Sequence, residues 1–129
     1  MYGCTPIGRP RSALNDGRCV SNNSARTTVL ESGLRLSNAL CFSPAGDRLY
    51  FADSLQHRIW SYAYDGASGA VRDRRVLIDT RALGSAPDGA TVDAEGFLWV
   101  ALVQAQKLAR ISAGGEVAEL VEPPIPYPS

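Results

Sequence analysis

Three polar side chains, Asp16, Asn38 and Asp88, have the chemistry of a cation site and are widely separated in the chain. Two carboxylates and an amide carbonyl are hard oxygen donors, which suit Ca²⁺, Mg²⁺ or Mn²⁺ better than a metal that prefers thiolates. Asn-Asp-Gly and Pro-Asp-Gly are also common turn sequences, whose side chains bond their own backbone. Spacing alone favours the turn interpretation. The choice between a turn and a cation site therefore depends on how the predicted strands position these residues.

Short strands dominate the chain from residue 34 onward, and no helical periodicity competes with them. Each strand has four to seven residues and is bounded by Gly, Asp, Asn or Pro. The predicted strands are 40–43, 48–53, 58–64, 75–79, 90–93, 97–102, 107–112 and 117–121. The sequence therefore predicts an all-β fold.

The last four strands repeat the first four at an offset of 49 to 50 residues. Asn38 aligns with Asp88, Leu49-Tyr50 with Leu98-Trp99, and Ile59 with Leu108. Four short strands repeated at this length are typical of the blades of a β-propeller. The first strand of each blade lines the central channel, so we expect Asp16, Asn38 and Asp88 to face one another there.

The repeat divides the chain as a single partial propeller domain, 1–129. Residues 1–33 form a blade remnant, 34–80 one blade, 85–122 a second blade, and 123–129 a linker to a blade that the chain lacks. About two blades cannot close a ring of four to eight, and their apolar faces need cover. We therefore expect homo-oligomers. The aromatic residues Tyr50, Trp60 and Trp99 are expected to pack between blades.

Charge and composition narrow the possible partners. Thirteen basic and thirteen acidic residues cancel and are scattered, which argues against nucleic acid and membrane surfaces. Neither a signal peptide nor a membrane span is readable, so a cytoplasmic location is expected. Three cysteines without C-x-x-C spacing favour reduced thiols. The single histidine, His57, and the lack of a G-x-S-x-G sequence disfavour a serine triad.

Three motifs in order resemble the regucalcin, senescence marker protein and gluconolactonase family. They are Leu14-Asn15-Asp16-Gly17, then Ser37-Asn38 with Leu49-Tyr50-Phe51-Ala52-Asp53, and Pro87-Asp88-Gly89 with Leu98-Trp99-Val100-Ala101. The resemblance extends over nearly all of residues 14–128. It implies a six-bladed propeller with one divalent metal in the channel, usually calcium, with zinc, magnesium or manganese as alternatives. Many family members hydrolyse sugar lactones such as gluconolactone.

The resemblance also assigns roles. Asn38 and Asp88 match two metal ligands, Asp88 matches the residue proposed as general base, Asn15 matches a substrate-binding position, and Asp16 lies beside the site. The family's third protein ligand, a glutamate, belongs to a blade absent from this sequence, and Ala13 replaces an arginine. Two functions follow: a metal-dependent lactonase, or a non-catalytic propeller fragment that serves as an oligomerising or interaction module with weak or no metal binding.

Overall fold

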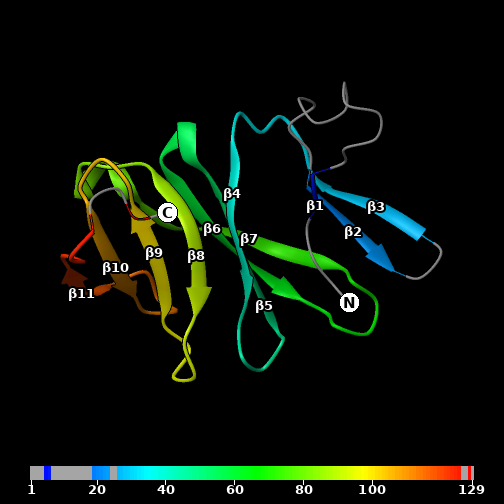
Figure 1. The fold of residues 1–129 in the computed structure, drawn as a ribbon. Coiled ribbons are helices and arrows are strands. Elements are labelled where there is room, and N and C mark those ends of the chain that lie inside the picture. Colours follow the sequence, from blue (N-terminus) through cyan, green and yellow to red (C-terminus); the bar gives the residue numbers. More distant parts are fainter. Residues whose placement is uncertain (1–4, 7–18, 24–25, 126–127, 129) are drawn as a thin grey trace.

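The computed structural model describes residues 5–6, 19–23, 26–125 and 128, and its strands form three antiparallel sheets (Figure 1). The first blade contains β4 (Ser37–Phe42), β5 (Arg48–Asp53), β6 (Arg58–Tyr64) and β7 (Val71–Asp79) in that order. The second contains β8 (Pro87–Val92), β9 (Leu98–Leu102), β10 (Lys107–Ile111) and β11 (Val117–Val121). A third sheet joins β1 (Thr5–Pro6), β2 (Cys19–Asn23) and β3 (Arg26–Glu31). The predicted all-β, blade-like fold is confirmed.

Three strands begin three or four residues earlier than predicted, and two of them are β4, at Ser37, and β8, at Pro87. β7 begins at Val71, four residues earlier than expected, and carries a bulge opposite Ser61 and Ala63. β2 pairs with β3 within the segment 1–33, for which the sequence predicts only a blade remnant. Ser and Asn have low β propensity, so the sequence of β2 gave no strand signal.

Successive side chains along a strand point to opposite sides of the sheet, so each blade has two faces. On one face of the first blade, Tyr50, Ala52 and Ile59 are at most 1% exposed. They form one core with aliphatic residues of the second blade, and these are Leu98, Val100, Leu102, Ala109 and Ile111. This core joins the two blades.

The opposite face of the first blade forms a second core. Phe51 and Trp60 lie with their rings stacked, 6.4 Å between centroids, and Leu30 of β3 packs against this cluster. The first blade is therefore covered on both faces, as expected from the positions of Tyr50 and Trp60.

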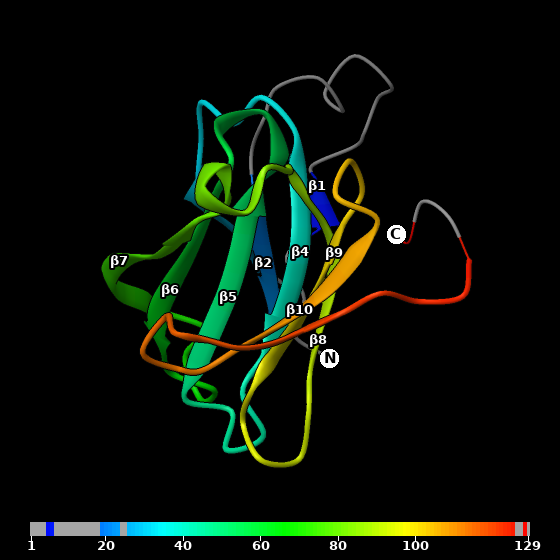
Figure 2. The ribbon, with the colours of Figure 1, turned by 90° about the vertical axis from the view of Figure 1, so that its left-hand side faces the viewer.

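Trp99 behaves differently from its counterpart Tyr50. It lies with Ala101 and Leu108 on the outward face of the second blade, where they line a hollow of 480 Å³. The second blade lies on the left in Figure 1, and Figure 2 shows the molecule from that side. Among the described residues no further blade covers this face, so the blade-to-blade packing predicted for Trp99 is not found in the described part. No helix in that part is long and apolar enough to cross a membrane.

Candidate functional site

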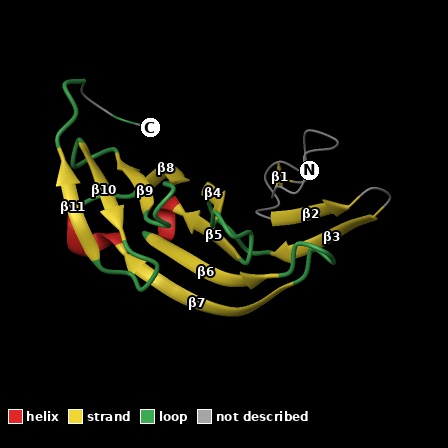
Figure 3. Cartoon of the chain, turned by 90° about the horizontal axis from the view of Figure 1, so that it is seen from below, coloured by secondary structure: helices red, strands yellow, loops and turns green. Residues whose placement is uncertain are grey.

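The strands β4 and β8 lie side by side where the two blades meet (Figure 1), and the view from below in Figure 3 shows the sheets fanning out from this line. Each strand is interrupted by a bulge at the same point of the repeat. The register shifts between Asn38 and Cys41 in β4, and between Pro87 and Ala90 in β8. Bulges re-aim side chains, and they occur here where the two polar residues stand.

The bulge in β4 contains an unusual backbone conformation. Ala39 has a φ of 52° although it is not glycine, and its side chain is 3% exposed. Such a conformation costs on the order of 1 kcal/mol or more and persists only where the surroundings enforce it. Here the surroundings include the Asn38 side chain, whose Oδ1 accepts a hydrogen bond from the Ala39 N–H at 3.1 Å.

Asn38 and Asp88 are in direct contact although 50 residues separate them. Asn38 Nδ2 donates to Asp88 Oδ1 at 2.6 Å, and both residues are half-buried. No other hydrogen bond to Asp88 is found among the described residues, which leaves Asp88 Oδ2 available to water or a ligand. The expected convergence of these two residues is present in the structure.

Ser54 belongs to the same network and was not predicted from the sequence. Its buried hydroxyl donates to the Pro87 carbonyl at 2.5 Å and accepts from Asn38 Nδ2 at 3.2 Å. Ser54 therefore ties the start of β8 to Asn38 and orients the amide. A serine after a strand is an ordinary turn residue by type, so no sequence signal pointed to it.

Asp53, next to Ser54, has a structural task instead. It is fully buried and accepts hydrogen bonds from the Arg35 and Leu36 N–H groups at 2.7 and 3.1 Å. Burial opposes its ionisation, but the bonds from Arg35, the Gln56 side chain and Leu36 outweigh burial and hold the pKa of Asp53 below its ordinary value. The carboxylate thus fixes the segment that leads into β4.

Asn15 and Asp16 lie outside the described residues. Their predicted roles, substrate binding for Asn15 and a place beside the site for Asp16, stay predictions.

A divalent cation partly fits the donors that the structure brings together. Asn38 Oδ1 and the Asp88 carboxylate are hard oxygens within one hydrogen-bonded pair, but calcium takes six to eight such ligands. Among the described residues, no group of three or more His, Cys, Asp or Glu side chains gathers as a metal site. The Asn38 amide also presents its N–H to Asp88, so it would have to turn over to offer its oxygen beside that carboxylate.

Neither Cys41 nor His57 offers alternative chemistry. Burial raises the pKa of the Cys41 thiol to about 12, which keeps it protonated. His57 Nδ1 lies 3.2 Å from the backbone carbonyl of Ser85 rather than near a serine hydroxyl. Asn38, Asp88 and Ser54 are therefore the candidate site.

The sequence pattern of the SMP-30/Gluconolactonase/LRE-like region matches residues 14–129. The chain belongs to this family. It is 34% identical to pentonolactonase XacC of Haloferax volcanii over 74 residues, which cover 57% of this chain and 25% of that protein. It is 35% identical to regucalcin of Xenopus laevis over 91 residues, which cover 70% of this chain and 30% of that protein.

The structures of the SMP-30/gluconolactonase family agree with this assignment. A calcium-binding regucalcin from Agrobacterium tumefaciens superposes with a TM-score of 0.78 at 25% identity, over 96% of this chain and 45% of the other. The two four-stranded sheets thus match part of a six-bladed propeller. The chain spans only about a quarter to under half the length of these relatives.

Proposed function

We propose that this chain carries out, or contributes to, metal-dependent hydrolysis of a sugar lactone. The observation that carries the proposal is the contact between Asn38 and Asp88 on adjacent inner strands. Relatives named as lactonases, such as the Haloferax pentonolactonase, support the substrate class.

Asp88 supplies the base in this proposal. Its Oδ1 is held by Asn38, and Oδ2 accepts the proton of a water molecule as the water oxygen bonds to the lactone carbonyl carbon. The ring C–O bond then breaks, and the leaving alkoxide takes up a proton to give the open hydroxy acid. Ser54 is a positioning residue, because it holds Asn38 and the backbone that precedes Asp88.

Once the Asn38 amide has turned over, Asn38 and Asp88 would also hold the cation through their oxygens, with calcium the metal favoured by the resemblance. When bound, a divalent cation would polarise the lactone carbonyl and stabilise its developing negative charge. The ligands beyond Asn38 and Asp88 would be water, substrate or other protein groups.

The test is acid release from gluconolactone and a pentonolactone, corrected for spontaneous hydrolysis, with calcium and with a chelator. Asp88→Asn should lower the rate roughly 100-fold or more, as loss of a general base does. The matched control is Asp47→Asn, which changes an exposed carboxylate at the opposite end of β5 and should leave the rate unchanged. Equal rates for wild type, Asp88→Asn and the protein-free blank would overturn the proposal.

A non-catalytic module is the second candidate, because only two donors gather in the described part. Calorimetric titration with calcium separates the two functions. Tight binding that Asn38→Ala and Asp88→Asn abolish supports the lactonase proposal. Millimolar or absent binding, together with no acid release, supports the interaction module.

A further inference from the structure

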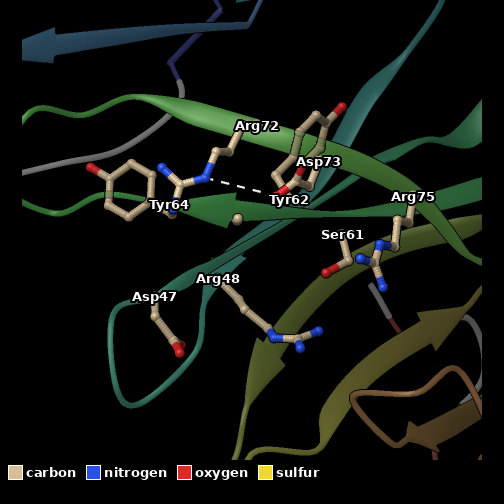
Figure 4. Close-up of a pocket in the computed structure, with 9 residues that line it drawn as sticks. Asp47, Arg48, Ser61, Tyr62, Tyr64, Arg72, Asp73 and Arg75 are labelled. Atoms are coloured by element: carbon tan, nitrogen blue, oxygen red, sulfur yellow. Dashed lines mark ion pairs between the residues drawn. The ribbon is translucent and has the colours of Figure 1, made fainter.

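A second polar site lies on the first blade, at the end of β5 far from Asn38. A hollow of 310 Å³ opens there over β6, where the short side chains Ser61 and Ala63 form its floor (Figure 4). Strand register places Arg48 opposite Ala63 and Arg75 opposite Ser61, so both arginines project on the same face as the floor. In Figure 4 their side chains flank Ser61.

The second blade fills the corresponding space with its own side chains. Arg110 is the counterpart of Ser61, since Arg110 pairs with Trp99 as Ser61 pairs with Tyr50. Its guanidinium lies 3.8 Å from the centroid of the Phe97 ring and pairs with Asp93 at 3.0 Å. In the second blade a cation thus occupies the space and an acid neutralises it.

The first blade reverses this arrangement. Ser61 leaves the space empty, and the counterpart of Phe97 is Arg48. Neither Arg48 nor Arg75 has a carboxylate oxygen within 4.0 Å among the described residues, whereas the neighbouring Arg72 pairs with Asp73 at 3.8 Å. Two guanidinium groups therefore border the hollow without a neutralising acid.

The floor contributes a polar group that lacks a partner in the described part of the chain. Ser61 is only 6% exposed, and no hydrogen bond to its hydroxyl is found among those residues. This hydroxyl lines the hollow, where a ligand can accept a hydrogen bond from it. Besides Asp73, the hollow is bordered by the carboxylate of Asp47, which accepts a hydrogen bond from the Ser43 hydroxyl at 2.8 Å.

We propose that Arg48, Arg75 and Ser61 bind a tetrahedral oxyanion of the phosphate or sulfonate type. Guanidinium groups present paired N–H donors that match such oxygens, and the Ser61 hydroxyl donates a further hydrogen bond from the floor. Arg48 precedes Ala52, the partner of Asn38, by four residues, about 13 Å along the strand. The oxyanion site is therefore separate from the lactone site and independent of its activity.

The experiment is a titration of the full chain with inorganic phosphate at low ionic strength, followed by amide NMR shifts and calorimetry. Saturable binding is expected, with shifts centred on β6 around Ser61. Arg48→Gln and Arg75→Gln should each weaken it roughly tenfold, the loss of one charge-assisted hydrogen bond, and Ser61→Ala several-fold. Arg72→Gln, which changes an already paired arginine of the same hollow, is the matched control and should weaken binding less than threefold.

The outcomes are decisive in both directions. A sulfonate such as methanesulfonate should compete with phosphate, whereas acetate at equal charge should compete poorly. The proposal is overturned if Arg72→Gln weakens binding as much as Arg48→Gln, which would indicate general screening of positive charge. It is also overturned if shifts do not saturate or map away from β6. Unchanged thermal unfolding of each variant verifies that folding is intact.

Discussion

The two blades place related residues at the same positions but in different surroundings. Tyr50, Ala52 and Ile59 of the first blade are buried by the second blade. Their counterparts Trp99, Ala101 and Leu108 border an open hollow. The repeat thus places apolar side chains on the face that points toward the next blade. Whether their burial stabilises the fold depends on the presence of that next blade.

The largest expected effect comes from a matched pair of truncations at one repeat position. Ile59 is fully buried, so Ile59→Ala should lower the free energy of unfolding by about 2–5 kcal/mol. Leu108 is half-buried, so Leu108→Ala should cost about 1 kcal/mol in dilute solution. Denaturant unfolding measures both. Equal costs for the two variants would show that the open face is not open in solution.

The same pair tests the expected self-association. If second copies cover the face of Trp99, the cost of Leu108→Ala should grow with protein concentration, because association stabilises the folded chain by mass action. The cost of Ile59→Ala should not. Light scattering on wild type and Leu108→Glu then shows whether association depends on this face, and a compact monomer at every concentration would contradict the expectation.

The segment that leads into the first strand of each blade is fixed by a hydrogen bond to a side chain, but the side chain differs between the blades. The segment before β4 is held by Asp53, which accepts from the Arg35 N–H at 2.7 Å. The segment before β8 is held by Gln104, whose Oε1 accepts from the Ala86 N–H at 2.7 Å. One anchor is ionisable and the other is not, so acid should weaken only the first blade's anchor.

Asp53→Asn should cost about 1.5–3 kcal/mol at neutral pH, since it weakens several hydrogen bonds to a charged group. The folded pKa of Asp53 lies below the unfolded value of about 3.9, so its contribution is present above that pH. The contribution is lost as the pH falls through the folded pKa. The stability gap between wild type and Asp53→Asn should therefore shrink in acid, whereas the gap for Gln104→Ala, about 1 kcal/mol, should stay constant. A gap for Asp53→Asn that does not change with pH would be inconsistent with this difference.

The strands and the contact between Asn38 and Asp88 could be predicted from the sequence. The reason is that the strand pattern and the 50-residue offset each depend on many residues at once. Ser54 could not be predicted, since a single hydroxyl acts through geometry that no periodicity encodes. The bulge that aims Asn38 was missed because the residue with positive φ in β4 is Ala39, not a glycine that would mark it. The comparison of Ser61 with Arg110 likewise required the observed register.

The smallest effect concerns the turns that begin the second strand of each blade. Asp93 accepts from the Phe97 N–H, the Trp99 indole N–H and the Arg110 guanidinium at 2.9 to 3.0 Å. Among the described residues, the hydroxyl of its counterpart Ser43 bonds only within its own turn, to Asp47 and the Arg48 N–H. Burial opposes ionisation of Asp93, but these hydrogen bonds and the nearby guanidinium lower its pKa to about 2.

Replacing each of the two turn residues tests this difference. Asp93→Ser should lower the melting temperature by a few degrees. It should also change the fluorescence of Trp99, because the indole N–H and Arg110 lose a partner. Ser43→Ala should lower the melting temperature by less and leave the fluorescence unchanged. Since the folded pKa of about 2 lies below the unfolded value, the stabilisation by Asp93 should be complete above about pH 4 and disappear as the pH falls through 2. A fluorescence change in Asp93→Ser that equals that of Ser43→Ala would show that Arg110 and Trp99 do not depend on Asp93 for their positions.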